Sequence, residues 1–290
     1  MRMPYAGAMR PPCLRTALYV PGSNPRALAK IPTLDADAYI LDLEDAVAPE
    51  AKVSARQRVR EALDAGLGQG RCIAVRVNGL ETPWGPDDLE ALMGREGLAA
   101  VVLPKCEDPR DVRGARAALG ADVGLWCMIE TPRGVLRAEA LACERGVDVL
   151  VMGTSDLAKD LRVSVEADRG PLQYALSAVL LAARAHDRLA LDGVCLALDA
   201  LDVFEAEARQ GKRLGFDGKT LVHPSTIAAA HTVFSPTVAE VDAALRVVRA
   251  FEAARAAGEG LCVLEGRLVE QLHVDAAKRL LAQAEFIARR

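Results

Sequence analysis

Charged side chains stand at or just after five short apolar runs of this sequence, and their types and positions could support chemistry. The runs are 38–43, 72–77, 99–104, 124–129 and 148–152, and the charged residues are Asp42, Glu44, Asp45, Arg76, Lys105, Glu130 and Asp156. In a parallel β/α barrel, functional groups sit at the carboxyl ends of the strands. If these runs are such strands, the seven side chains gather at one face of the molecule.

Glu130 and Asp156 are the candidate metal ligands. They follow consecutive apolar runs, one βα unit apart. Neighbouring strands lie about 4.8 Å apart, so the two carboxylates can converge on one point. Proteins usually hold Mg²⁺ through one or two carboxylates and leave its other coordination positions to water and substrate oxygens. The spacing therefore predicts a Mg²⁺ site, with Mn²⁺ as an alternative ion.

Arg76 ends its apolar run and is the candidate anion-binding residue. Its planar guanidinium suits a bidentate interaction with a carboxylate or phosphate. A metal beside such a group suits a 2-oxo or 2-hydroxy acid, whose carboxylate and adjacent oxygen can chelate the ion. The metal would then act as a Lewis acid on the oxygen where negative charge develops.

Each of these residues also has a purely structural interpretation. Asp156 could stabilise a helix start through the helix dipole, Glu130 could serve end-of-strand electrostatics, and Arg76 could pair with a core acid. Their joint placement on three strand ends favours the functional interpretation. For Lys105 we expect a supporting ion pair rather than a Schiff base, because nothing nearby in the sequence indicates desolvation of its amine.

The elements that must position these residues are eight apolar runs alternating with helical patterns. Near-continuous apolar runs of four to six residues are typical of strands buried on both faces. Eight of them separated by helices favour a (β/α)8 TIM barrel, which we expect to span residues 1–258. The eight runs are 16–20, 38–43, 72–77, 99–104, 124–129, 148–152, 189–194 and 218–223, and the clearest helical patterns are 51–64, 108–118, 133–145, 171–186 and 202–214.

The C-terminal residues have no place in a closed barrel. A helix at about 237–257 is expected to close the eighth unit, and 259–290 then form a C-terminal helical extension. Val274, Ala277 and Leu281 follow helical spacing in this extension, so its apolar stripe must be buried somewhere. We expect it to pack either on its own barrel or, as we favour, on a neighbouring subunit.

Composition excludes several classes of protein. The 290 residues are 51% hydrophobic and carry a net charge of −4, which indicates a globular chain without bulk attraction to nucleic acid or membrane. No apolar run approaches the roughly 18 residues needed to span a bilayer. The seven cysteines have no C-x-x-C spacing and the four histidines are scattered, so we expect reduced thiols, no zinc and a cytoplasmic protein.

Several motifs, in order along the chain, resemble one family. The segments are RTALYVPGSNPRALAK (15–30), LDLEDAVAPEAK (41–52), VRVNGLETPWGPDDL (75–89), VVLPK (101–105), MIETPRGV (128–135), VMGTSDLAKDL (151–161) and LGFDGKTLVHPSTI (214–227). The chain is similar to the citrate lyase β-subunit-like (CitE-like) and malyl-CoA lyase branch of the HpcH/HpaI aldolase superfamily. The resemblance implies a TIM barrel in a homotrimer or hexamer. It also implies Mg²⁺-dependent cleavage of a C–C bond in a 3-hydroxyacyl-CoA thioester of the citryl-, malyl- or citramalyl-CoA type, which releases an acyl-CoA and a 2-oxo acid.

The resemblance also assigns roles to individual residues. Glu130 and Asp156 match the metal ligands, with Glu130 also at the substrate, and Arg76 matches the ligand of the substrate carboxylate. Asp45 and Glu44 match an acidic pair near the metal, Asp45 with a catalytic role and Glu44, like Lys105, with a supporting one. Arg15 and Lys30 fall where the family's first βα unit approaches the phosphates of CoA, which is part of the substrate.

One departure from the family pattern concerns the acid/base residue. Family members that act on malyl-CoA carry a G-x-M-[IV]-D-x-P segment whose Asp reaches a neighbour's active site, and here the segment reads GRLVEQL (266–272). Glu270 therefore stands in place of Asp. One extra methylene can misplace a proton by about 1 Å and cost about 100-fold in rate. In addition, the usual Gly-Ala-x-Asp is GTSD (153–156) here.

Two alternative functions remain open at this stage. The same site could let water attack the thioester, which would make the protein a malyl-CoA thioesterase. Alternatively, the chain could be a citrate lyase subunit that acts on an acyl-carrier-protein thioester. The intact Glu130, Asp156 and Arg76 argue against a decayed relative without activity.

Overall fold

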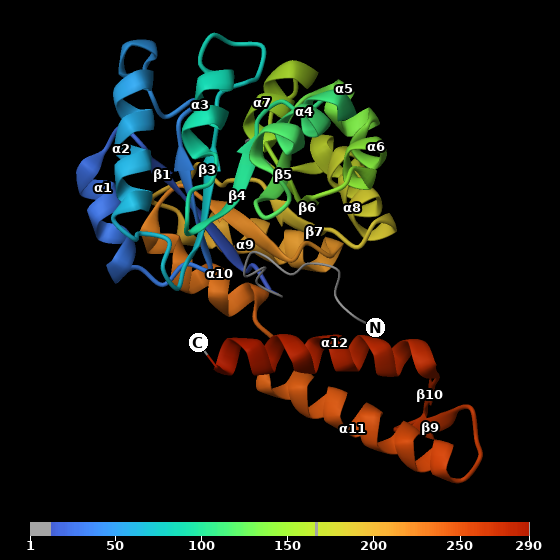
Figure 1. The fold of residues 1–290 in the computed structure, drawn as a ribbon. Coiled ribbons are helices and arrows are strands. Elements are labelled where there is room, and N and C mark those ends of the chain that lie inside the picture. The colour runs from blue at the N-terminus through green and yellow to red at the C-terminus, as the bar shows by residue number, and fades with distance from the viewer. Residues whose placement is uncertain (1–12, 166–167, 290) are drawn as a thin grey trace. The chain divides into compact units, whose positions relative to one another are not determined.

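In a computed structural model of the chain, residues 13–165 and 168–289 are described. Within these ranges eight strands pair in parallel, each with the next along the chain, and β8 pairs with β1, which closes the barrel (Figure 1). The expected barrel is confirmed, and every strand overlaps an expected run. The strands are β1 Thr16–Pro21, β2 Ala38–Asp42, β3 Cys72–Arg76, β4 Leu98–Leu103, β5 Gly124–Ile129, β6 Val147–Met152, β7 Leu189–Asp192 and β8 Gly218–Leu221.

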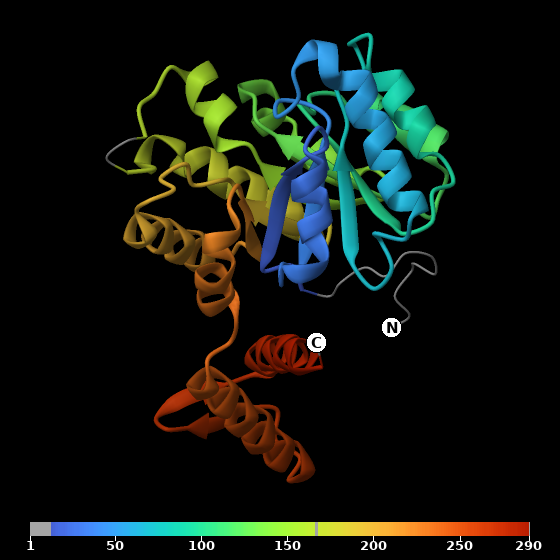
Figure 2. The same cartoon turned by 90° about the vertical axis from the view of Figure 1, so that its left-hand side faces the viewer.

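Helices surround the barrel (Figure 2). Those attached to the barrel are α1 Pro25–Lys30, α2 Lys52–Asp64, α3 Gly85–Leu92, α4 Pro109–Leu119, α5 Pro132–Leu136, α6 Ala138–Cys143, α7 Thr154–Leu161, α8 Gln173–Ala185, α9 Leu201–Leu214 and α10 Ile227–Phe234. The pattern at 133–145 is two short helices rather than one. A cap begins α5, since Thr131 accepts a hydrogen bond from the backbone N–H of Gly134 and Pro132 occupies the first helical position.

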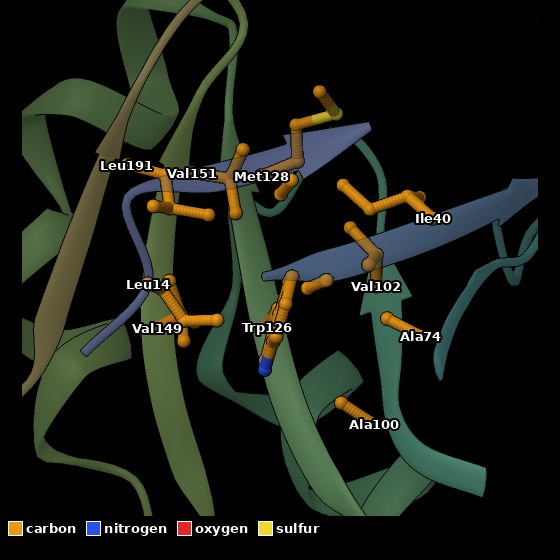
Figure 3. Packing of buried hydrophobic residues seen from close by; sticks show 12 residues of the cluster. Leu14, Ile40, Ala74, Ala100, Val102, Trp126, Met128, Val149, Val151 and Leu191 are labelled. Carbon is orange, nitrogen blue, oxygen red and sulfur yellow. The ribbon is translucent and has the colours of Figure 1, made fainter. Parts of the chain in front are cut away.

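Small and large apolar side chains pack together in the barrel interior. Ala17, Ala38, Ala74 and Ala100 come from β1 to β4 and share a buried cluster with Trp126 of β5 (Figure 3). The alanines leave room inside the barrel for the indole, as interior layers of small barrels require.

The alternation of side chains along the strands explains which residues point into the barrel at its functional face. Ala17, Ile40, Ala74 and Met128 all belong to the buried cluster inside the barrel. Successive side chains in a strand point to opposite faces, so residues two positions apart share a face. Two residues further on, at the carboxyl end of each strand, stand Tyr19, Asp42, Arg76 and Glu130.

The C-terminal residues form a second compact unit that begins earlier than expected. The chain divides into Met1–Val233 and Phe234–Arg290, whereas the sequence placed the boundary at 258/259. The reason is that α10, not the helix expected at 237–257, is the helix that follows β8. The expected helix, α11 Val238–Ala256, packs against α12 Gln271–Ala288 within the second unit.

A hairpin in this second unit was not predicted. Strands β9 Cys262–Leu264 and β10 Arg267–Val269 pair in antiparallel fashion. Glu265 and Gly266 between them have φ of 50° and 75°, and two residues of positive φ are typical of a tight hairpin loop. The unit has its own small core, formed by Phe251, Val269 and Val274.

No helix in the described part of the chain is long and apolar enough to cross a membrane.

Candidate active site

A cavity of about 390 Å³ opens at the carboxyl ends of the barrel strands. Charged and polar side chains form one part of its lining and apolar side chains form the rest. The polar lining residues are Tyr19, Asp42, Asp45, Arg76, Glu130, Thr154, Ser155 and Asp156, and the apolar ones include Ala46, Met128, Met152, Val194, Leu196 and Val222. The structure thus brings together five of the residues singled out in the sequence, Asp42, Asp45, Arg76, Glu130 and Asp156.

Glu130 lies at the floor of this cavity directly after β5. Its side chain is buried, and its Oε1 accepts a hydrogen bond of 2.8 Å from the backbone N–H of Lys105. Lys105 has a left-handed backbone with φ of 47°, a conformation that non-glycine residues keep only where the surroundings enforce it. Burial, together with the charge of Glu44, raises the pKa of the Glu130 carboxyl to about 7. A bound cation would hold this carboxylate ionised.

Asp156 reaches the cavity from the first turn of α7, and Gly153 explains how α7 comes so close to Glu130. The Gly153 N–H donates to the carbonyl oxygen of Ile129 at 3.0 Å. A Cβ atom at Gly153 would lie 2.4 Å from Cβ and 2.5 Å from Oε2 of Glu130. Only glycine allows this approach, which brings the β6–α7 segment with Asp156 against Glu130.

Arg76 is buried and its donors already have protein partners. Its Nε and Nη2 donate to the two carboxylate oxygens of Asp42 at 2.7 and 2.6 Å. Its Nη1 pairs with Glu44 Oε2 at 2.9 Å and with Asp45 Oδ2 at 3.3 Å. The bidentate edge that the sequence assigned to a substrate is therefore occupied by Asp42, and the structural interpretation of Arg76 holds in part.

Glu44 links this ion-pair network to the Glu130 loop. Its Oε1 accepts a hydrogen bond of 2.8 Å from the Lys105 ammonium, so Lys105 forms the supporting ion pair that the sequence led us to expect. Glu44 is itself buried, and this burial raises the pKa of its carboxyl. Lys105 thus supports both Glu44, through its side chain, and Glu130, through its backbone.

Arg15 does not fit the role expected from the resemblance. It precedes β1, so it lies at the amino end of that strand, whereas the cavity lies at the carboxyl ends. It is buried, and its Nε and Nη2 donate to the carboxylate of Asp37 at 2.9 and 2.8 Å. Arg15 is thus part of a structural ion pair. Lys30 is exposed at the last residue of α1.

Glu270 belongs to the second unit, where it immediately precedes α12. It is exposed, and its backbone N–H donates to Nδ1 of His273 at 3.0 Å.

Asp42 and Tyr19 line the cavity without a role predicted from the sequence. Asp42 is one of the strand-end acids, and its pairing with Arg76 is a finding of the structure. The alternation in TALYV, which places Tyr19 on the same face of β1 as Ala17, is the signal that could have indicated Tyr19.

The donor set fits a magnesium ion. No group of three or more His, Cys, Asp or Glu side chains in residues 13–165 and 168–289 forms a metal cage. Mg²⁺ seldom uses such cages, because it keeps several waters and takes one or two carboxylates together with substrate oxygens. Glu130 and Asp156 at an open cavity match that requirement, and their side chains are the ones that would hold the ion.

Three comparisons relate the chain to known proteins. The sequence model of the family described as HpcH/HpaI aldolase/citrate lyase matches residues 15–224. A (3S)-malyl-CoA thioesterase of Cereibacter sphaeroides is 45% identical over 274 residues, which cover 94% of this chain and 95% of the relative. The citrate lyase subunit beta of Escherichia coli is 37% identical over 284 residues, covering 94% and 93%.

Among solved structures, the chain is similar to the protein CitE of Mycobacterium tuberculosis in complex with magnesium, acetoacetate and coenzyme A. The match has a TM-score of 0.78 and 30% sequence identity, and it covers 94% of this chain and 98% of that one.

Proposed function

The chain belongs to the HpcH/HpaI aldolase/citrate lyase family, and we propose that it is a Mg²⁺-dependent enzyme that hydrolyses a malyl-CoA-type thioester. The observation that carries the proposal is the pair of carboxylates, Glu130 and Asp156, at one cavity at the mouth of the barrel. The resemblance in sequence implies C–C cleavage as the reaction, with hydrolysis of the thioester as an alternative. The 45% identity to a malyl-CoA thioesterase, against 37% to a citrate lyase subunit, supports the reverse order.

In hydrolysis, the oxygen of water forms a bond to the thioester carbon and the C–S bond breaks. The proton released by the water ends on the thiol of CoA, and the products are the hydroxy acid and free CoA. A Mg²⁺ ion held by Glu130 and Asp156 would supply Lewis-acid stabilisation of the negative charge that develops on oxygen.

The protein's own residues orient the acid end of the substrate. Arg76 is fixed by Asp42, and it contributes positive charge to a cavity that also contains Asp45. Lys105 holds Glu130 through its backbone N–H and Glu44 through its ammonium. These contacts fix the candidate metal ligand before the substrate arrives, so no reorganisation is needed at the moment of reaction.

We further propose that Glu270 acts as the acid/base residue of a neighbouring subunit. The assembly would be a homotrimer or hexamer in which the C-terminal residues of one copy complete the site of the next. In hydrolysis Glu270 would accept the proton of the attacking water.

We propose two further features. The exposed Lys30 would approach the phosphates of CoA. The enzyme would be located in the cytoplasm.

A second candidate is the C–C lyase reaction, and membership of a family that includes a citrate lyase subunit favours it. There the substrate hydroxyl loses its proton, the bond between the carbon bearing that hydroxyl and the carbon next to the thioester breaks, and the products are an acyl-CoA and a 2-oxo acid. An acyl-carrier-protein thioester is a further substrate form for this reaction.

The experiment that tests the proposal is incubation with a panel of acyl-CoAs, alone and with 2-oxo acids, followed by mass spectrometry of the products. We expect free CoA from malyl-CoA only when Mg²⁺ is present. Asp156→Asn should abolish the release, whereas Asp160→Asn, an exposed acid later in α7, should not. Release of CoA that is independent of Mg²⁺ and of Asp156 would contradict the proposed site.

A further inference from the structure

Tyr19 extends from β1 into the ion-pair network of the cavity. It lines the cavity together with Arg76 and Met128. The guanidinium carbon of Arg76 lies 5.0 Å from the centre of the Tyr19 ring, a cation–π distance that fixes the ring and the charge relative to each other. The phenol is thus held in place beside the charge that would attract an anionic substrate.

The hydroxyl of Tyr19 has a poor hydrogen-bond partner. Among the described residues, its recorded acceptor is Sδ of Met128 at 3.9 Å, and a thioether sulfur is a weak acceptor. Phenol hydroxyls away from bulk water usually find an oxygen or nitrogen partner. Burial raises the pKa of the Tyr19 phenol, so the group remains a donor over the whole physiological range.

The donor groups of Arg76 are already used by protein carboxylates, so a ligand carboxylate needs another hydrogen-bond donor. Nε and Nη2 of Arg76 are engaged by Asp42, and its Nη1 faces Glu44 and Asp45. A carboxylate that enters the cavity therefore meets the charge of Arg76 but not its free bidentate edge. The hydroxyl of Tyr19 is a donor at the same place, and in residues 13–165 and 168–289 its hydrogen-bond acceptor is a sulfur and not an oxygen.

We propose that the Tyr19 hydroxyl donates a hydrogen bond to a carboxylate oxygen of the substrate's acid end and is a specificity-determining residue of this site. The inference rests on the proposed function, since it takes the substrate to be a thioester of a hydroxy dicarboxylic acid. It assigns to Tyr19 the selection of thioesters that carry a free carboxylate over those that lack one.

The test compares Tyr19→Phe with Tyr174→Phe in the full-length protein. Tyr19→Phe keeps the ring below Arg76 and removes only the hydroxyl. Tyr174 is an exposed tyrosine of α8, so the same change there leaves the cavity untouched. Calorimetry in Mg²⁺ measures the affinity for malate and for acetyl-CoA, which lacks the carboxylate, and a separate titration measures the affinity for Mg²⁺ alone.

We expect Tyr19→Phe to weaken malate binding by about 10-fold or more, because a hydrogen bond to a charged group is lost. Affinities for acetyl-CoA and Mg²⁺ should stay within about twofold of the wild type, and Tyr174→Phe should change nothing. A wild-type affinity for malate in Tyr19→Phe overturns the role of Tyr19, and a parallel loss of acetyl-CoA and Mg²⁺ binding overturns it in favour of a structural role. Wild-type protein that binds neither malate nor acetyl-CoA contradicts the proposed function as well.

Discussion

Nε and Nη2 of Arg76 lie 2.7 and 2.6 Å from the two carboxylate oxygens of Asp42, at the adjoining ends of β3 and β2. The strands set this contact, because Asp42 and Arg76 are directly paired in the parallel register. An arginine at a strand end therefore serves first to organise the acids around it. Its contribution to a ligand is the charge that this rigid arrangement presents to the cavity.

Replacement of Arg76 should consequently change stability as well as ligand binding. Arg76→Lys keeps the charge but loses the bidentate contact with the buried Asp42, and we expect the free energy of unfolding to fall by about 2 kcal/mol. Urea denaturation measures this. The matched control is Arg95→Lys, whose ion pair with Asp64 is more exposed and should cost less than about 1 kcal/mol. Equal effects of the two changes would show that the Arg76–Asp42 pair contributes nothing beyond a surface ion pair.

The raised pKa of Glu130 predicts how pH affects the metal-free protein. Its pKa is about 7 in the fold against 4.5 in an unfolded chain, so the folded state binds the proton more tightly. The contribution of Glu130 to the free energy of unfolding is therefore largest below about pH 4.5. It falls as the pH rises through about 7 and levels off at higher pH. The total loss is at most about 3.5 kcal/mol, since the pKa differs by about 2.5 units and one unit corresponds to about 1.4 kcal/mol.

Thermal unfolding of wild type and Glu130→Gln from about pH 4 to pH 8, without metal, isolates this effect, because all other titrating groups are common to both. The glutamine variant should gain stability relative to wild type as the pH rises to about 7. Mg²⁺ should stabilise the wild type more at pH 8 than at pH 6, because the ion competes with the proton. A pH-independent difference between the two proteins would show that Glu130 titrates normally.

Gly153→Ala tests whether the close approach of α7 to Glu130 builds the metal site. The added methyl would meet Cβ and Oε2 of Glu130 at 2.4 and 2.5 Å, so it must displace the carboxylate, and we expect Mg²⁺ affinity to fall by more than 10-fold. Gly114→Ala, in α4 with no atom within 4 Å of the added carbon, is the control and should bind Mg²⁺ normally. Normal Mg²⁺ binding by Gly153→Ala would show that the close approach of Gly153 to Glu130 is not needed for the metal site.

Complementation between subunits tests the role of Glu270. Glu270→Gln and Glu130→Ala should each be inactive, and Glu270→Gln should retain its affinity for Mg²⁺. Mixing the two should restore part of the activity, because some mixed interfaces contain both intact groups. If activity stays absent while subunit exchange is verified by mass spectrometry, Glu270 does not act across an interface.

The barrel and much of its site could be predicted from the sequence because both depend on local pattern. Near-continuous apolar runs such as that ending at Ile129 are typical of strands buried on both faces, and in a parallel barrel the residues at or just after the ends of these runs lie at the functional face. This was sufficient to place Arg76, Glu130 and Asp156 at one cavity.

Other features depend on pairings that no spacing encodes. Arg15 is the first residue of a recognisable motif, but its burial against Asp37 follows from the packing at the amino end of β1. The division of the chain after Val233 was missed because the short helix α10 already completes the eighth unit. The partner of Arg76 could have been expected only from the register of β2 and β3, which brings Asp42 opposite it.

The most direct test of the central claim is the fate of (3S)-malyl-CoA incubated with the enzyme and Mg²⁺ in ¹⁸O-labelled water. Mass spectrometry of the products distinguishes the two reactions, because hydrolysis joins the oxygen of water to the former thioester carbon and C–C cleavage uses no water. We predict free CoA and malate that carries one labelled oxygen, both absent without Mg²⁺ or with Asp156→Asn. Acetyl-CoA and glyoxylate as the products, with no labelled malate, would contradict the account.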